Sequence, residues 1–167
     1  MENKSNLRGF TLIELLLVIA IIAILAGVVF VALNPAARLQ DARDAVRKSD
    51  TEEILGAAKL NQLDNAGTYL AAITAMTAGN VYMIGTAVAG CDDQAAYCDT
   101  DPTGDTSCVD LTGLVTSGHL GAIPVSPNGG GTWTAAVSGY TATKTTTGAL
   151  TIRACESENT TEISATR

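Results

Sequence analysis

The hydrophobic and polar positions divide the chain into an apolar first part, a charged second part and a mixed third part. From Leu15 to Leu33 there are 19 residues without a charge. A helix of that length is about 28 Å long, which matches the hydrocarbon core of a bilayer. The run is too long for the apolar segment of a secretory signal and is followed directly by a polar stretch. We therefore predict one retained membrane-spanning helix over residues 10–33.

The helix is expected to continue beyond the apolar run after a kink at Asn34-Pro35, because proline lacks an amide hydrogen and disfavours helical geometry in the residue before it. Residues 36–63 contain no further proline and one glycine, Gly56. Apolar residues recur there at nearly helical spacing: Leu39, Ala42, Val46, Ile54, Ala57 and Ala58. The interleaved charges predict a solvated helix face, with contact to neighbouring subunits as the alternative.

The third part has shorter apolar segments, separated by turn residues. It predicts strands over residues 81–88, 132–137, 140–145 and 149–154, a short helix over 111–120, and turns at Ser138-Gly139 and Thr147-Gly148. The predicted fold class is α+β, with a long N-terminal helix packed on a small antiparallel sheet. The predicted divisions are a leader over 1–9, the long helix over 10–62 and an exported β-rich domain over 63–167.

The charge is unevenly distributed along the chain. Residues 63–167 hold ten acidic and three basic residues, which accounts for the whole formal net charge of −7. An acidic surface of this kind repels phosphate groups, so direct binding of nucleic acid is not expected.

Four cysteines lie in the third part: Cys91, Cys98, Cys108 and Cys155. An even number in an exported segment predicts disulfides, and three pairings are possible. Zinc is the competing interpretation, but the spacings fit no usual zinc motif and the single histidine, His119, is not near a CxxC pair.

An acidic loop between the cysteines is a candidate calcium site. Asp92, Asp93, Asp99 and Asp101 are the leading candidates for ligands, with Asp105 and Asp110 nearby, because calcium prefers oxygen ligands. The loop has no EF-hand register, and a solvated acidic loop is the simpler interpretation. No other cofactor is expected.

Glu14 stands near the start of the apolar run. Acids within membrane-spanning segments are costly and usually have a functional partner. A cut between Gly9 and Phe10 would create an α-amine at Phe10, four residues before Glu14. Pairing of the two charges, within a chain or between chains, would fix the register of packed helices.

The sequence Gly9-Phe10-Thr11-Leu12-Ile13-Glu14 follows a short leader with Lys4 and Arg8 and precedes the apolar helix. It closely resembles the class III signal of type IV pilins and pseudopilins, over residues 1 to about 35. The resemblance implies cleavage after Gly9 by a prepilin peptidase, N-methylation of Phe10 and a need for Glu14 in assembly. It also implies a single-pass precursor in the cytoplasmic membrane, with its N-terminus in the cytoplasm, and no enzymatic activity.

In this family, assembly machinery with a cytoplasmic ATPase moves subunits from the lipid bilayer into a helical homo-oligomeric filament. We expect a subunit of an extracellular type IV pilus, with possible outputs in motility or adhesion. A periplasmic pseudopilin of a type II secretion or DNA-uptake system is the alternative. A tethered adhesin is a further interpretation. A tethered enzyme is disfavoured because the exported part has one histidine, no GxSxG and no metal-ligand motif.

Overall fold

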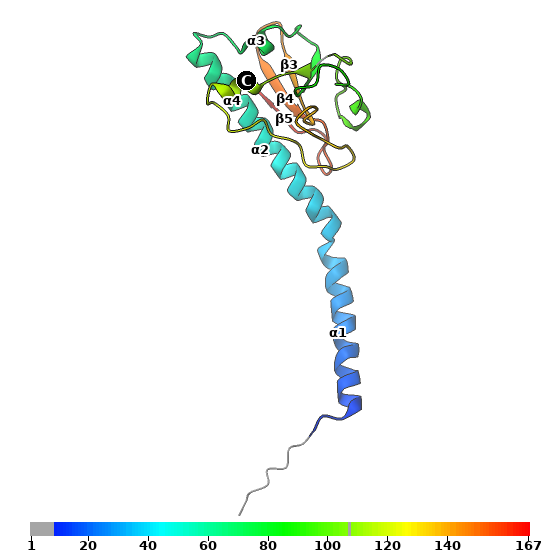
Figure 1. Cartoon of the computed structure of the whole chain (residues 1–167). Helices are drawn as coiled ribbons and strands as arrows, with labels where there is room; N and C mark the ends of the chain where they lie inside the picture. Colours follow the sequence, from blue (N-terminus) through cyan, green and yellow to red (C-terminus); the bar gives the residue numbers. More distant parts are fainter. Residues whose placement is uncertain (1–8, 107) are drawn as a thin grey trace, which may run out of the picture. The chain divides into compact units, whose positions relative to one another are not determined.

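The computed structural model describes residues 9–106 and 108–167 (Figure 1). It contains two compact units, Met1–Leu39 and Gln40–Arg167. The composition-based division at residue 62 stays a prediction. The predicted leader, residues 1–9, falls largely outside the described residues, since Gly9 is its only described position.

The first unit is built around helix α1, Leu12–Leu33. The helix ends at Asn34, which has left-handed backbone angles of φ 38° and ψ 70°. Asparagine adopts this conformation more readily than most residues, and Pro35 then occupies the first position of α2, where its missing amide hydrogen costs nothing. The helix is therefore interrupted at Asn34 and resumes at Pro35, at the position where the sequence predicts a kink.

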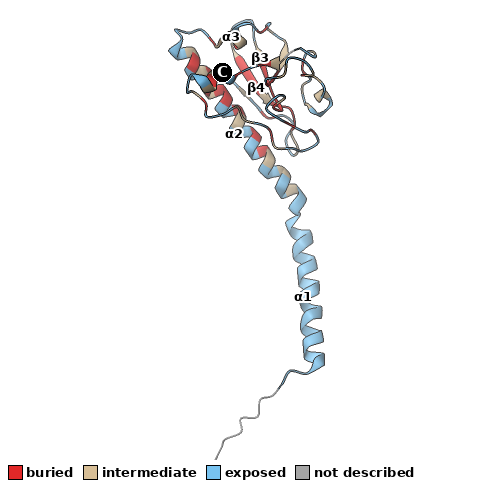
Figure 2. Ribbon diagram, in the orientation of Figure 1, coloured by how far each residue is buried: buried red, intermediate tan, exposed pale blue. Residues whose placement is uncertain are grey.

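Helix α2 spans Pro35–Asp64, and its part from Gln40 onward is the longest element of the second unit. Its buried residues are Asp44, Arg47, Thr51, Ile54, Leu55, Ala57, Ala58 and Asn61 (Figure 2). Of the apolar residues that recur at nearly helical spacing, those in the second half of the helix are buried and those in the first half are exposed. Leu39 and Val46 are 62 % and 46 % exposed, whereas Arg47 is fully buried. The reason is tertiary, because the buried Glu156 and the partly buried Glu158 pair with Arg47.

The sheet has the strand order β2-β1-β3-β4-β5. The strands are β1 Val81–Ile84, β2 Cys108–Val109, β3 Tyr140–Lys144, β4 Leu150–Ala154 and β5 Ser164–Thr166. Neighbouring strands are antiparallel except for β1 and β2, which run parallel. The predicted α+β class is confirmed, and the sheet is mixed rather than wholly antiparallel.

Individual elements differ from the sequence prediction in informative ways. The strand predicted over 132–137 is a loop, because Thr134 and Val137 exchange backbone hydrogen bonds of 2.9 and 3.1 Å and form a tight turn. The strand predicted over 81–88 ends at Ile84, and the helix over 111–120 is shortened to α4, Thr112–Thr116. Four elements were not predicted from the sequence: α3 (Ala71–Thr74), the short 3-10 helix η1 (Ala95–Tyr97), β2 and β5.

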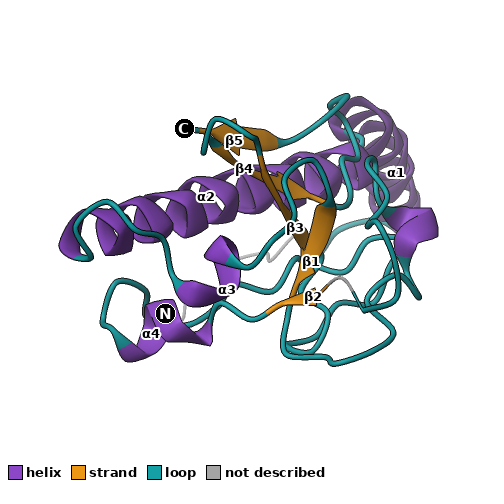
Figure 3. Cartoon of the chain, turned by 90° about the horizontal axis from the view of Figure 1, so that it is seen from above, coloured by secondary structure: helices purple, strands orange, loops and turns teal. Residues whose placement is uncertain are grey.

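Helix α2 lies along one face of the sheet (Figure 3). The main core joins Ile54 and Ala58 of α2 to Ala142 and Ile152, which lie opposite each other on β3 and β4. Successive strand residues point to opposite faces, so Met83 lies in a second cluster. That cluster also contains Cys91, Trp133 and Cys155. The two cores position the loops and disulfides around the sheet.

Candidate functional site

The predicted processing site lies in front of α1. Gly9 and Phe10 precede the helix and are exposed, with Phe10 87 % exposed. The helix begins at Leu12, so the peptide bond between Gly9 and Phe10 is not protected by helical hydrogen bonds. Exposed backbone of this kind is open to a peptidase.

Glu14 caps its own helix in this structure. Its carboxylate accepts hydrogen bonds of 2.8 Å from the Thr11 amide and from the Thr11 hydroxyl, and its amide donates to the same hydroxyl at 3.3 Å. This reciprocal arrangement is a capping box, which satisfies two of the amide groups left free at a helix start. Glu14 therefore has a partner within the chain even without a free amine at Phe10. This cap was not predicted, although T-x-x-E before an apolar run is the usual sequence signal for it.

The surface of α1 is apolar and uncovered. None of its residues from Leu12 to Leu33 is buried. Among the described residues, one helix is long and apolar enough to cross a membrane, and it lies near the N-terminus. A shallow groove along α1 is lined by Ala23, Ile24, Gly27, Val28, Val31 and Ala32. Small residues there would allow a neighbouring helix to approach closely.

A family model described as the prokaryotic N-terminal methylation motif matches residues 4–30. The chain carries this motif. It is the class III prepilin signal of type IV pilins, so the resemblance recognised from the sequence around Glu14 is confirmed. A search of curated proteins and a search of solved structures found no match. The methylation motif supports a pilin-like or pseudopilin-like protein with a membrane-anchored precursor.

The matched segment includes the described residues Gly9, Phe10 and Glu14, which carry the predicted roles in cleavage, methylation and assembly. The leader cations Lys4 and Arg8 lie outside the described residues. The three roles stay predictions, and the geometry is compatible with each of them.

The four cysteines form two disulfides, Cys91–Cys108 and Cys98–Cys155. This selects one of the three possible pairings. Each of the four sulfurs is bonded to one partner sulfur, so in this state none of them can act as a zinc thiolate. The first bond ties the start of the acidic loop to β2, and the second ties its middle to the residue after β4.

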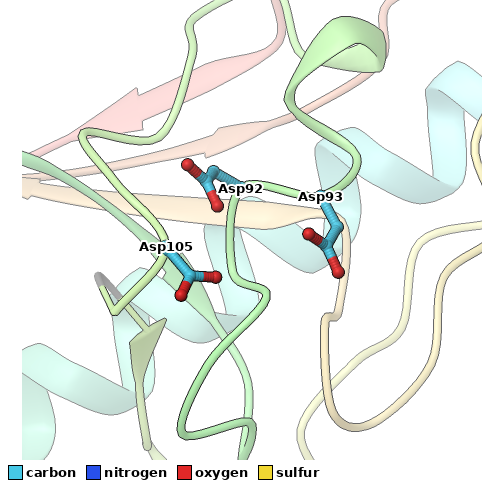
Figure 4. A group of neighbouring side chains, drawn as sticks. All are labelled: Asp92, Asp93 and Asp105. Carbon is cyan, nitrogen blue, oxygen red and sulfur yellow. The ribbon is translucent and has the colours of Figure 1, made fainter.

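Three acids of this loop lie close together: Asp92, Asp93 and Asp105 (Figure 4). One ligand oxygen from each lies within 4.8 Å of the others. Asp99 and Asp101, which the sequence suggested alongside Asp92 and Asp93, are not part of this group. The Asp99 amide donates instead to the Cys155 carbonyl at 2.6 Å, and burial raises the pKa of the Asp99 carboxyl. Calcium binding stays a prediction. Its candidate ligands are now Asp92, Asp93 and Asp105, without Asp99 and Asp101.

A group of buried and partly buried charges, which no pattern in the sequence predicted, links α2 to the segment after β4. We call it the Arg47 cluster, which consists of Arg43, Asp44, Arg47, Glu156 and Glu158. Arg47 donates to Asp44 at 2.9 Å and to Glu156 and Glu158 at 2.8 Å each. The charged face of α2 was predicted to be solvated, and for Asp44 and Arg47 this is wrong.

The backbone completes the Arg47 cluster. Asp44 accepts from the amides of Glu158 and Asn159, and Glu156 accepts from the amides of Gly130 and Gly131. A hydrogen bond from Arg43 is the main cause that lowers the pKa of Glu158 to about 2. The cluster holds the loop around residue 130 and the segment after β4 against α2. Its role is structural, since its polar groups are satisfied within the chain.

Proposed function

We propose that this chain is a structural subunit of a type IV pilus-like filament. The observation that carries the proposal is the coincidence of the methylation motif with a helix, Leu12–Leu33, that has no buried residue. Such a large apolar surface is unfavourable in water and must be buried. Lipid buries it in a precursor, and neighbouring helices bury it in a filament. Cleavage after Gly9 by a prepilin peptidase, methylation of Phe10 and a structural rather than catalytic role belong to this proposal.

Glu14 acts in two stages in this proposal. In the precursor its carboxylate caps α1 through Thr11. After cleavage, the new amine of Phe10 supplies a positive charge near the same helix start. If the Glu14 carboxylate left Thr11 and paired with this amine, in the same chain or in a neighbour, the pairing would favour one register of packed helices. Assembly machinery driven by a cytoplasmic ATPase would move the subunit out of the bilayer.

Two substitutions of Glu14 separate its charge from its capping role. Glu14→Gln keeps a side-chain oxygen that can cap the helix, whereas Glu14→Ala removes both the cap and the charge. We expect both variants to be inserted and cleaved, and both to lose most of the filament yield. Filament yield is measured by electron microscopy and by the amount of subunit in sheared surface material. Normal filaments from Glu14→Gln would show that the charge is not needed.

Intact mass and N-terminal sequencing of sheared surface material test the proposal itself. A chain that begins at Phe10, with or without a methyl group, is the expected result. A processed chain found only in membranes would indicate a pseudopilin of a secretion or DNA-uptake system. A chain that keeps its leader in cells containing the peptidase would overturn the proposal.

A further inference from the structure

The second unit contains an apolar pocket that the filament proposal does not use. Its volume is about 370 Å³, and it lies between the end of β1, helix α4 and residues 121–123. Its walls include Ile84, Leu111, Val115 and Ile123. Pockets that bind small molecules usually have volumes of about 300–1,000 Å³, apolar walls and a few polar groups. This pocket has the size for a small ligand with a compact apolar body.

One carboxylate gives the pocket a charge preference. Asp110 is the sole charged residue among the twelve described residues that line it, and it is exposed. One of its oxygens accepts a hydrogen bond of 2.8 Å from the Thr112 amide, which fixes the orientation of the side chain. The remaining acceptor positions of the carboxylate can receive a donor from a ligand.

Asp110 also lines a second hollow, of about 220 Å³, together with Met76, Tyr82 and Val109. The carboxylate thus borders two hollows that are both lined mainly by apolar side chains. An acid in this position attracts cations but not anions, and the surrounding walls favour cations that carry apolar groups. The acidic excess of residues 63–167 acts in the same direction.

We propose that this pocket binds small organic cations that join an ammonium group to a compact aromatic or branched aliphatic body. The apolar body occupies the space between Ile84, Val115 and Ile123, and the ammonium group pairs with Asp110. The proposal does not depend on the filament function, because it rests on the second unit alone.

Three small probes separate the contributions to binding. Benzylamine carries the charge and the ring, benzyl alcohol is its neutral isostere, and methylammonium carries the charge without the ring. The full chain in nanodiscs of zwitterionic lipid is titrated with each probe, while NMR follows the methyl signals of Val115 and Ile123. These signals report binding in the pocket and not partitioning into lipid.

We expect saturable binding of benzylamine with a Kd on the order of 1 mM, as befits a ligand of this size. Benzyl alcohol should bind about two- to fivefold more weakly, the range expected for a solvent-exposed ion pair. Equal binding of the amine and the alcohol would overturn the charge preference. If methylammonium bound as tightly as benzylamine, the apolar walls would contribute nothing and only a general attraction of cations would be left. If benzylamine binding did not saturate, the proposed site would not exist.

Substitutions test the assignment to Asp110. Asp110→Asn keeps an acceptor for the Thr112 amide and removes the charge, so benzylamine should weaken to the level of benzyl alcohol. Asp101→Asn removes the same charge from an exposed position outside the pocket and should leave benzylamine binding unchanged. Ala122→Phe adds a ring to the lining and should abolish binding of both aromatic probes. Equal losses from Asp110→Asn and Asp101→Asn would contradict a specific role for Asp110.

Discussion

At the scale of single residues, Arg47 makes the contacts that join distant segments of the second unit. Its side chain is fully buried, and all five of its N–H groups find acceptors: Ser126, Asp44, Glu158, Pro127 and Glu156. A buried guanidinium is tolerated only when its charge and its donors are satisfied. The partners come from α2, from the loop before Trp133 and from the segment after β4. One side chain therefore joins three parts of the chain.

Loss of Arg47 should be strongly destabilising. Arg47→Ala leaves Glu156 and the partly buried Glu158 without their buried cation, and breaking a buried ion pair in this way costs about 3–5 kcal/mol. Lys48→Ala, which removes an exposed cation from the adjacent position, should change stability by no more than about 0.5 kcal/mol. Thermal unfolding of the full chain, followed by Trp133 fluorescence, measures both. A similar small effect of the two substitutions would show that the cluster contributes little.

Glu158 predicts a dependence of stability on pH. Its pKa is about 2 in the folded chain, mainly because Arg43 donates a hydrogen bond to it, against about 4.3 for an unperturbed glutamate. A carboxyl with a depressed folded pKa stabilises the fold above its unfolded pKa and loses this contribution as the pH falls toward the folded value. We expect stability to fall between about pH 5 and pH 2. Glu158→Gln should be less stable at neutral pH and should show a smaller loss over this range; parallel pH profiles would contradict the assignment.

At the scale of elements, α2 shows how far a hydrophobic pattern predicts which side of a helix is buried. The sequence predicted the helix and the helical spacing of Ile54, Ala57 and Ala58, and the structure buries these three residues. It could not predict that Arg47 faces inward and Val46 outward, because both arrangements are compatible with a helical repeat. The choice depends on Glu156 and Glu158, which are more than 100 positions away.

The disulfides act on the loop element between β1 and β2, and their two contributions should be unequal. The bonds close loops with sequence separations of 57 for Cys98–Cys155 and 17 for Cys91–Cys108. In the chain-entropy model, loops of these lengths correspond to about 4 and about 3 kcal/mol.

We therefore expect the Cys98→Ser, Cys155→Ser double variant to unfold at a lower temperature than the Cys91→Ser, Cys108→Ser double variant. Cys155 also directly precedes Glu156, so its release should loosen the Arg47 cluster as well. Thermal unfolding of the oxidised full chain compares the two pairs. The reverse order would mean that native contacts, rather than loop length, set the contribution of each bond.

At the scale of the whole molecule, the chain combines two units with different requirements. The first, Met1–Leu39, exposes its apolar helix and carries the methylation motif. The second, Gln40–Arg167, buries its own core and forms two disulfides. This division suits a subunit that joins its partners through the helix while its domain faces solvent, as the proposed filament requires.

The features that depend on residues close along the chain could be predicted from the sequence alone. The apolar run, the interruption at Asn34-Pro35, the motif around Glu14 and the hairpin of β3 and β4 all rest on local composition, backbone restrictions or side-chain period. The cap formed by Thr11 and Glu14 also rests on a local pattern, T-x-x-E before an apolar run.

Four other features arise only from tertiary packing: the cysteine pairing, the parallel contact of β1 with β2, the Arg47 cluster and the pocket beside Asp110. Each of these joins residues that are distant along the chain. Such contacts form when the whole core packs and sets the distances between side chains, and no local pattern records those distances.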